Sequence, residues 1–445
     1  MAASTPFGYV DAVRALRRAL TFGINPSLEP IRAMAAELGR PQDAFASVQV
    51  TGTNGKSSVT RLIAALFEAH NVCAGAYTSP ELHSYTERIA CGGVPVSEVM
   101  FTAAVGEALD AATRAGVTPT EFEIVTAACL WAFRECGVEA AVLEVGMGGR
   151  WDATSVVEPT VAVITGVGLD HTAHLGETRE AIAADKAHII REHSVAVLGP
   201  GTVGVEVAFH ERVSAIGTTA LVRAVRPAGA VSPVAEADTV RYTVTTTPEA
   251  PDGATRVDVA GIFAAYTGVE VRAPAYQAAN VATAIAAAEA FLERALDAHT
   301  VRRAVATITF PGRFQVLGRD PWLVVDAAHN PEGATVLARA IAAAWPDPVR
   351  RPTIVLGVLA DKDAIGIVAA LAPVAMRFVC VAPESSRALP AADLAAVVER
   401  VTGTRPEVAE SVAAGVEAAL AGSQAGAVVT GSIRTVAAAT AVAGR

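Results

Sequence analysis

The sequence predicts an α/β protein with two domains, and three observations carry this prediction. Unalternating apolar runs at 140–144 and 160–165 end in glycine-rich turns, which is typical of parallel strands covered by helices on both faces. A β-prone run at 47–50, a glycine loop and an apolar-periodic helix follow one another near the N-terminus. Beyond residue 322, short apolar strands recur at the spacing of βα units, which indicates a second α/β domain.

The glycine loop has the features of a phosphate-binding loop. The stretch 48–58 reads Val-Gln-Val-Thr-Gly-Thr-Asn-Gly-Lys-Ser-Ser. Gly52 and Gly55 let the backbone curl with its N–H groups inward, and Lys56 and the helix N-terminus add positive charge. Val50 stands where the usual eight-residue signature has glycine, so only the short form Gly-x-x-Gly-Lys-Ser is present. The loop indicates a polyphosphate cradle, and a glycine turn with a solvated lysine remains the alternative.

Composition limits the class of protein. A chain of 445 residues exceeds the size of a single core, so two domains, or two with a small third, are expected. The net charge of −10 and the absence of a basic stripe argue against a nucleic-acid surface. Five scattered cysteines without a Cys-x-x-Cys pair indicate free thiols in a reducing compartment. Without a signal-peptide core or a long apolar window, the sequence predicts a cytoplasmic protein with no membrane segment.

The elements follow in chain order. Periodicity and capping signals predict helices at 10–20, 28–38, 57–66, 97–115, 121–136 and 278–296. Apolar runs predict strands at 47–50, 75–78, 140–144, 160–165, 323–325, 353–356, 378–381 and 427–429. A texture of valine, threonine, glycine and proline predicts a small β-rich lobe at about 194–274, in which 241–247 alternates like a solvent-facing antiparallel strand. The stretch 307–311 is expected to be a hinge.

Four polar groups come at the ends of predicted parallel strands. Ser79, Glu144 and His171 follow three of these strands, and the phosphate loop follows the fourth. Ligands of parallel sheets bind at the carboxyl ends of the strands, so these groups are expected to converge on one edge. Taken singly, each has a simpler interpretation as a turn serine, a solvated acid or a loop histidine.

Eight motifs then occur in order and cover nearly the whole chain. They are Thr51–Lys56, Ser79-Pro80 with Glu87-Arg88-Ile89, Glu121-Phe122-Glu123, Leu143–Arg150 with Asp152-Ala153-Thr154, Gly168–His171 with Leu175-Gly176, Asp185-Lys186-Ala187, Pro311–Phe314 and Asp326–Pro331. In this order the chain resembles the folylpolyglutamate synthase and dihydrofolate synthase family of the Mur ligase superfamily. The resemblance implies a P-loop ATPase domain at 1–309, which includes the β-rich lobe, and a Rossmann-like glutamate-ligase domain at 310–445.

The resemblance also implies an activity. Members of this family use ATP to phosphorylate a substrate carboxylate, and the amine of glutamate then attacks the acyl phosphate. The implied substrates are L-glutamate with dihydropteroate, with a reduced folate, or with both, and the implied cofactors are ATP and one or two Mg²⁺ ions. The implied state is a monomer that binds small molecules and no nucleic acid.

The resemblance assigns site residues by motif. The implied catalytic residues are Lys56, Lys186 and His329. The implied nucleotide contacts are Asn54, Gly55, Lys56, Ser57, Asn280, Arg313 and Asp326. The implied metal ligands are Ser79, Glu144 and His171, of which histidine suits a hard ion least. The implied substrate contacts are Thr120, Glu121, Phe122, Glu123, Trp151, Asp152 and Ala153. Lys186 matches a lysine that many Mur ligases carry as a carbamate, and a surface lysine is its alternative interpretation.

The sequence departs from the family pattern at two positions, and two other functions are alternatives to the implied one. Ser57 replaces the usual glycine after the loop lysine, and Glu81 stands where many members have histidine. A Mur ligase relative that acts on a UDP-muropeptide is the nearest alternative, but the Glu121–Glu123 motif and the missing nucleotide-sugar domain argue against it. A nucleotide-binding protein without ligase activity would be expected to lack some of the residues that the ligase chemistry needs.

Overall fold

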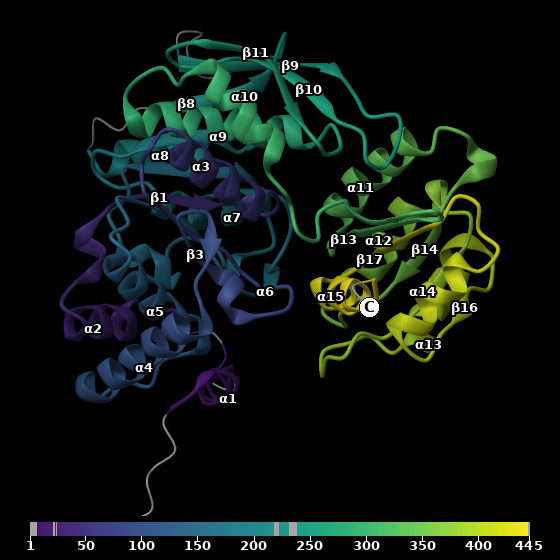
Figure 1. The fold of residues 1–445 in the computed structure, drawn as a ribbon, viewed down its shortest axis with the longest axis horizontal. Coiled ribbons are helices and arrows are strands. Elements are labelled where there is room, and N and C mark those ends of the chain that lie inside the picture. The colour runs from purple at the N-terminus through teal and green to yellow at the C-terminus, as the bar shows by residue number, and fades with distance from the viewer. Residues whose placement is uncertain (1–6, 21–22, 24, 218–221, 231–237, 444–445) are drawn as a thin grey trace, which may run out of the picture. The chain divides into compact units, whose positions relative to one another are not determined.

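The computed structural model describes residues 7–20, 23, 25–217, 222–230 and 238–443. The chain divides into two compact units, each with its own core (Figure 1). The first unit contains 1–243, 258–269 and 279–305, and the second contains 244–257, 270–278 and 306–445.

The first sheet supplies the strand ends on which the site is built. In the described residues it has eleven strands in the order β11-β10-β9-β8-β7-β6-β1-β5-β2-β3-β4. The strands are β1 (Ala46–Thr51), β2 (Ala74–Tyr77), β3 (Ile89–Cys91), β4 (Val94–Pro95), β5 (Ala140–Glu144), β6 (Val161–Gly166), β7 (Val195–Gly201), β8 (Val222–Pro227), β9 (Thr239–Thr246), β10 (Thr255–Ala260) and β11 (Ala265–Val271). The strands from β2 through β5, β1, β6 and β7 to β8 are paired in parallel, so their carboxyl ends share one edge.

The described residues before the second sheet form ten α-helices. They are α1 (Tyr9–Ala19), α2 (Glu29–Glu37), α3 (Lys56–Ala69), α4 (Glu98–Ala115), α5 (Glu121–Glu135), α6 (Thr172–Leu175), α7 (Arg179–Lys186), α8 (Glu206–Ala215), α9 (Gln277–Leu292) and α10 (Ala298–Thr307). One core joins α1, α2, α4 and α5 to Tyr77, Ile89 and Leu143, and α4 and α5 lie side by side in Figure 1. A second core packs α7 and α8 on β6 and β7.

Local sequence explains where the long helices begin. The Ser97 hydroxyl accepts the Met100 N–H at the start of α4, and Gly116, with φ of 67°, ends that helix in the left-handed conformation. Thr120 and Glu123 cap the start of α5 with a reciprocal pair of hydrogen bonds. Both helices therefore begin within one residue of their predicted starts.

The second sheet lies in the second unit. Among the described residues it has six strands, in the order β12-β13-β17-β14-β15-β16. They are β12 (Gln315–Arg319), β13 (Trp322–Asp326), β14 (Thr353–Leu356), β15 (Phe378–Cys380), β16 (Glu407–Val408) and β17 (Ala427–Thr430). All the pairs are parallel except β12 with β13. The helices are α11 (Pro331–Ala344), α12 (Ala364–Leu371), α13 (Ala391–Thr402), α14 (Val412–Leu420) and α15 (Ile433–Ala443).

The α/β class and the parallel arrangement of both sheets confirm the prediction from sequence, with one difference in the predicted lobe. Residues 195–215 form β7 and α8, a further βα unit of the main sheet. The strands that follow extend that sheet, and β9 pairs in parallel with β8, so the expected antiparallel pairing of 241–247 is wrong on that side. Side-chain alternation shows that a strand has one exposed face, which is common in antiparallel sheets but also occurs in a parallel strand with one uncovered face.

Within the described residues, none of the helices has the length and apolarity needed to cross a membrane.

Candidate active site

The phosphate loop lies between β1 and α3, at the carboxyl edge of the first sheet. Gly55 adopts φ of 87° and caps α3, and a Cβ atom at this position would lie 2.9 Å from Asn280 Oδ1. The Thr165 hydroxyl, at the end of β6, donates to the Asn54 carbonyl at 2.6 Å. The Thr53 hydroxyl donates to the Gly168 carbonyl at 3.1 Å. The loop is therefore held from β6 and the loop after it, and a side chain at Gly55 would meet the Asn280 side chain of α9.

Lys56 folds back over its own loop. Its Nζ donates to the Gly52 carbonyl at 2.9 Å and to the Thr53 carbonyl at 3.2 Å. The side chain is half-buried and lines a pocket together with the loop backbone. A solvated lysine on a simple turn would not be held in this way, so the structure favours the interpretation as a phosphate cradle.

Glu144 is fixed by the two segments on either side of it. Its side chain ends β5 and the residue is only 1% exposed. The Ser57 hydroxyl donates to Oε1 at 2.9 Å, and the Ser79 backbone N–H donates to Oε2 at 3.1 Å. Glu144 is therefore not the solvated acid of the simpler interpretation, and the Ser57 departure from the family adds a hydrogen bond to it.

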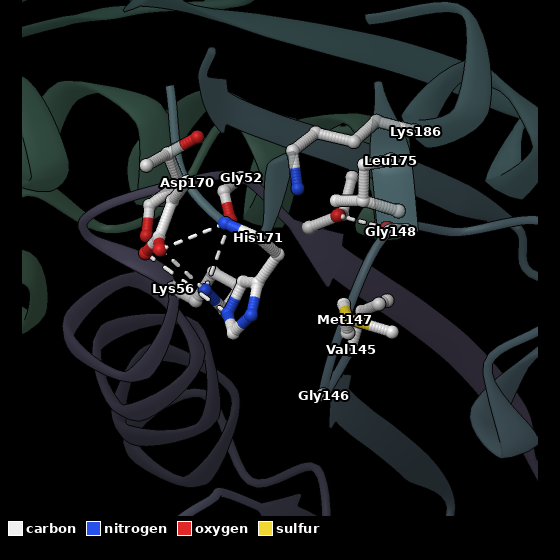
Figure 2. Close-up of a pocket in the computed structure, with 12 residues that line it drawn as sticks. Gly52, Lys56, Val145, Gly146, Met147, Gly148, Asp170, His171, Leu175 and Lys186 are labelled. Atoms are coloured by element: carbon white, nitrogen blue, oxygen red, sulfur yellow. Dashed lines mark hydrogen bonds and ion pairs between the residues drawn. The ribbon is translucent and has the colours of Figure 1, made fainter. Parts of the chain in front are cut away.

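A pocket forms around the loop lysine (Figure 2). Its empty volume is about 250 Å³, which includes some space open to solvent. It is lined by Thr51, Gly52, Thr53, Lys56, Val145, Gly146, Met147, Gly148, Asp170, His171, Leu175 and Lys186. His171 begins α6 in the left-handed conformation, and its backbone N–H donates to Asp170 Oδ1 at 2.9 Å. Figure 2 shows Lys56 beside Asp170 and His171, while Lys186 points into the same space from another side. The structure thus gathers Lys56, His171 and Lys186 in one pocket, with Ser57, Ser79 and Glu144 as a neighbouring group.

Lys186 is 4% exposed at the end of α7, which excludes the interpretation as a surface lysine. Burial is the main cause that lowers its pKa, and the charge of Lys56 acts in the same direction. Asp185, Asp170 and Asp152 oppose the shift, and the pKa comes to about 7. A substantial fraction of this amine is therefore neutral near pH 7.

Most polar side chains of the predicted substrate segment at the start of α5 form hydrogen bonds to other groups of the protein. The Glu123 carboxylate accepts the Thr120 N–H at 2.7 Å and the Thr120 hydroxyl at 2.9 Å. Glu121 accepts from Arg88 Nη1 at 2.5 Å in a buried ion pair. The Phe122 ring remains half-buried and lies against Gly146, where a Cβ atom would be 2.7 Å from Phe122 Cζ.

The second predicted substrate segment follows the glycine loop after β5. Asp152 is buried, and its carboxylate accepts the Met147 N–H and the Thr154 N–H, each at 3.0 Å. Trp151 is 45% exposed and lies under the Arg150 guanidinium, with 4.8 Å between the guanidinium carbon and the ring centroid. Ala153 is buried. This segment therefore has an exposed ring next to a rigid, hydrogen-bonded turn.

Three predicted site residues lie in the second unit, around the end of β13. Asp326 is buried, and its carboxylate accepts the Phe314 N–H at 2.8 Å and the Ala328 N–H at 2.9 Å. Burial raises the pKa of Asp326, although the positive charge of Arg313 and these hydrogen bonds oppose the shift. His329 Nδ1 lies 2.9 Å from the Ala327 carbonyl, which orients the ring before α11 begins.

Two acids of the quoted motifs, which received no role from the sequence, also shape the site. Asp170 lines the pocket, and Asp185 Oδ1 accepts the Gly149 N–H at 2.9 Å, which fixes the glycine loop after β5. The sequence places both acids within motifs, but their partners are visible only in the structure. Among the residues that the structure describes, no group of three or more His, Cys, Asp and Glu side chains is arranged to hold a metal ion.

Comparisons with known proteins identify the family. The model of the Mur ligase middle domain matches residues 50–200, and that of the Mur ligase glutamate ligase domain matches 312–432. A dihydrofolate synthase/folylpolyglutamate synthase of Mycobacterium tuberculosis is 36% identical over 454 residues, which cover 95% of this chain and 91% of the relative.

Solved structures show the same fold over the whole length. A folylpolyglutamate synthase of M. tuberculosis, complexed with ADP and AMPPCP, matches at a TM-score of 0.87 and 33% identity, covering 98% of this chain and 99% of that one. E. coli FolC, in complex with DHPP and ADP, matches at a TM-score of 0.86 and 30% identity, covering 99% of this chain and 98% of that one. The chain therefore belongs to the dihydrofolate synthase/folylpolyglutamate synthase family, whose members are ATP-dependent ligases of the Mur ligase type.

Proposed function

We propose that this protein uses ATP and Mg²⁺ to join L-glutamate to dihydropteroate, to a reduced folate, or to both. The observation that carries the proposal is the meeting of the phosphate loop, Lys186 and the buried Glu144 at one edge of the first sheet. Membership of the family supports a pteridine-linked carboxylate over a UDP-muropeptide as the substrate. The domain boundary that we propose lies at 309/310, between the two matched domain regions.

ATP, when bound, supplies the phosphoryl group that activates the substrate carboxylate. Lys56 and the amides of Asn54, Gly55 and Ser57 are the groups that would hold its phosphates. Phosphoryl transfer depends on neutralising and positioning charge more than on covalent participation by the protein. The Lys56 hydrogen bonds to the Gly52 and Thr53 carbonyls keep the ammonium at the loop, so only a local rearrangement is needed to reach a phosphate.

The residues near the loop fit Mg²⁺. This ion prefers oxygen ligands and usually binds through one or two carboxylates, with phosphates and water as the other ligands. Glu144 offers a buried carboxylate that two neighbouring segments already orient, and Ser79 lies next to it. His171 lies in the adjoining pocket and would be the weakest ligand of the three. We therefore expect a Mg²⁺ site with few protein ligands.

Lys186 suits a carbamate. Carbon dioxide adds to a neutral amine, and a pKa of about 7 provides one. An ammonium in this pocket would add to the positive charge of Lys56 near a bound metal, whereas a carbamate would bring a negative oxygen ligand. We therefore propose that Lys186 is carbamylated in the active enzyme.

Family membership supports nucleotide contacts for three further residues. Arg313 and Asp326 are proposed to contact phosphates and ribose, and Asn280 is proposed to contact adenine. The Ala327 carbonyl orients the ring of His329, and we propose that this ring accepts a proton from the amine of glutamate.

The substrate would lie against the segments that begin α5 and follow β5. Phe122 and Trp151 are partly exposed aromatic side chains in these segments, and the hydrogen bonds of Glu123 and Asp152 fix the backbone beside them. Thr120, Glu123 and Asp152 therefore support the substrate site mainly through the backbone that they fix.

A coupled ADP-release assay tests the proposal. The enzyme with ATP and Mg²⁺ is supplied with glutamate and either dihydropteroate or tetrahydrofolate, and with each omitted in turn. ADP release that requires both glutamate and a pteridine supports the proposal, and a product heavier by one glutamyl residue confirms the bond. Release that needs a UDP-muropeptide instead would contradict it.

A further inference from the structure

Arg88 is a buried charge that the chemistry above does not use. It ends the short 3₁₀-helix Tyr85–Arg88, directly before β3, and is 3% exposed. Removing a guanidinium from water is costly, and a buried arginine is expected to have partners that use its full geometry.

The guanidinium joins segments that are distant in the sequence. Nη1 donates to Glu121 Oε1 at 2.5 Å, and Nη2 donates to the Tyr77 hydroxyl at 3.0 Å. Glu81 Oε2 lies 3.9 Å from Nη1. Arg88 thus links the end of β2, the loop that carries Glu81, and the first residue of α5.

Aromatic rings enclose the same group. The guanidinium carbon lies 5.6 Å from the centroid of Phe122, 5.7 Å from that of Tyr77 and 5.9 Å from that of Tyr85. These distances are those of cation–π contacts. Because Phe122 also touches Gly146, its ring is held between Arg88 and the glycine loop after β5.

Arg88 stays charged at every pH at which the protein is folded. Burial acts to lower its pKa, but Tyr77, Glu121 and Glu81 outweigh that effect and the pKa is raised. The Glu121 carboxylate therefore always faces a cation, and losing that cation would leave a buried acid without its ion-pair partner.

Stability alone does not account for this network. Buried ion networks often contribute no more to stability than apolar residues of the same volume would. Arg88 Nε has no hydrogen-bond partner among the described residues, so the network is not fully satisfied. A role in holding Glu121 and Phe122 accounts for the geometry better.

We propose that Arg88 is a positioning residue that sets the pteridine affinity by fixing the Glu121 carboxylate and the Phe122 ring, an inference that rests on the proposed function. Lysine at this position keeps the charge, but it cannot donate along two fixed directions or lie flat between rings.

The test compares Arg88→Lys with Arg226→Lys. Arg226, on β8, is an equally buried arginine in the same unit, is paired with Glu206 at 3.0 Å, and also has an unpartnered Nε among the described residues. Its hydrogen bonds go to Glu206 and to the Leu198, Gly199 and Val225 carbonyls, none of which belongs to a predicted site residue. Steady-state constants are measured for the pteridine, ATP and glutamate, together with thermal unfolding.

For Arg88→Lys we expect the KM of the pteridine to rise about tenfold or more, while kcat and the other two KM values change less than about threefold. For Arg226→Lys we expect lower thermal stability without the selective KM change. Equal effects of the two variants, or an unchanged pteridine KM in Arg88→Lys, would overturn the proposal.

A second variant covers the case in which Arg88→Lys does not fold. Tyr77→Phe removes only the hydroxyl that accepts from Nη2, and we expect a smaller rise of the pteridine KM, about threefold, at constant kcat. An unchanged KM in that variant would overturn the proposal. A wild-type enzyme that turns over neither pteridine would refute the proposed function itself, which separates the two failures.

Discussion

At the scale of single residues, the motifs located the chemical groups, whereas their partners became visible only in the structure. The short Gly-x-x-Gly-Lys-Ser pattern marked Lys56, but the hydroxyl of Thr165 that holds the loop comes from β6. Glu144 was expected at a strand end, yet its fixed orientation depends on Ser57 and Ser79. Arg88 belongs to a quoted motif, but it received no role from the sequence, because burial is a property of the packed fold.

Lys56→Ala is expected to lower kcat by about a hundredfold or more, because a transition-state charge is lost. The fold should remain intact, since Lys56 is half-buried at the first position of α3 and outside the described cores. Turnover and thermal unfolding measure the two effects. Near-normal turnover would refute the assignment of the loop.

Glu144→Gln is expected to raise the Mg²⁺ concentration needed for half-maximal rate and to lower the rate, because shape is kept while a charge is lost. Glu289→Gln is the matched control. Glu289 is a fully buried carboxylate in the same unit that accepts from the Tyr266 hydroxyl at 2.6 Å and from the backbone of 262–264. A Mg²⁺ titration that Glu144→Gln and Glu289→Gln shift equally would speak against a metal role for Glu144.

Lys186 gives a pH dependence of stability. Its pKa falls from 10.5 in the unfolded chain to about 7 in the folded one, so between these values the unfolded state binds more protons. Stability should therefore rise with pH from about 7 towards 10 in buffer free of bicarbonate, and Lys186→Met should remove that rise. Urea unfolding of both proteins at several pH values measures it. Parallel curves for the two proteins would show that Lys186 titrates normally.

At the scale of elements, the predictions agree best where local signals and packing coincide. The strand at 140–144 has the predicted bounds because a continuous apolar run suits a fully buried parallel strand. The predicted lobe did not separate β7 and α8 from the strands after them, because valine and threonine suit central and edge strands alike. Thr120 and Glu123 were assigned to substrate, while the structure shows that they also cap α5.

The cap of α5 can be tested by itself. Thr120→Ala should lower the free energy of unfolding by about 1 kcal/mol, and Thr120→Ser should restore most of it, because serine keeps the oxygen that accepts the Glu123 N–H. Denaturant unfolding of the three proteins gives the comparison. Equal loss in both variants would mean that the methyl group of Thr120, and not its hydroxyl, stabilises the helix.

At the scale of the whole molecule, apolar runs predicted both sheets, and eight ordered motifs implied the order of the two domains. In the proposed reaction, ATP phosphorylates the substrate carboxylate, and the acyl group is then transferred to the amine of glutamate. One oxygen atom of the carboxylate must leave with the phosphate, since the bond that breaks is the one between the acyl carbon and that oxygen.

The most direct measurement uses dihydropteroate or tetrahydrofolate whose reacting carboxylate carries ¹⁸O, with ATP, Mg²⁺ and L-glutamate. We expect mass spectrometry to find a pteridine product extended by glutamate and inorganic phosphate that carries a single ¹⁸O atom. Product without ¹⁸O in the phosphate would contradict activation of the carboxylate by phosphorylation, and the absence of glutamylated product would contradict the proposed function.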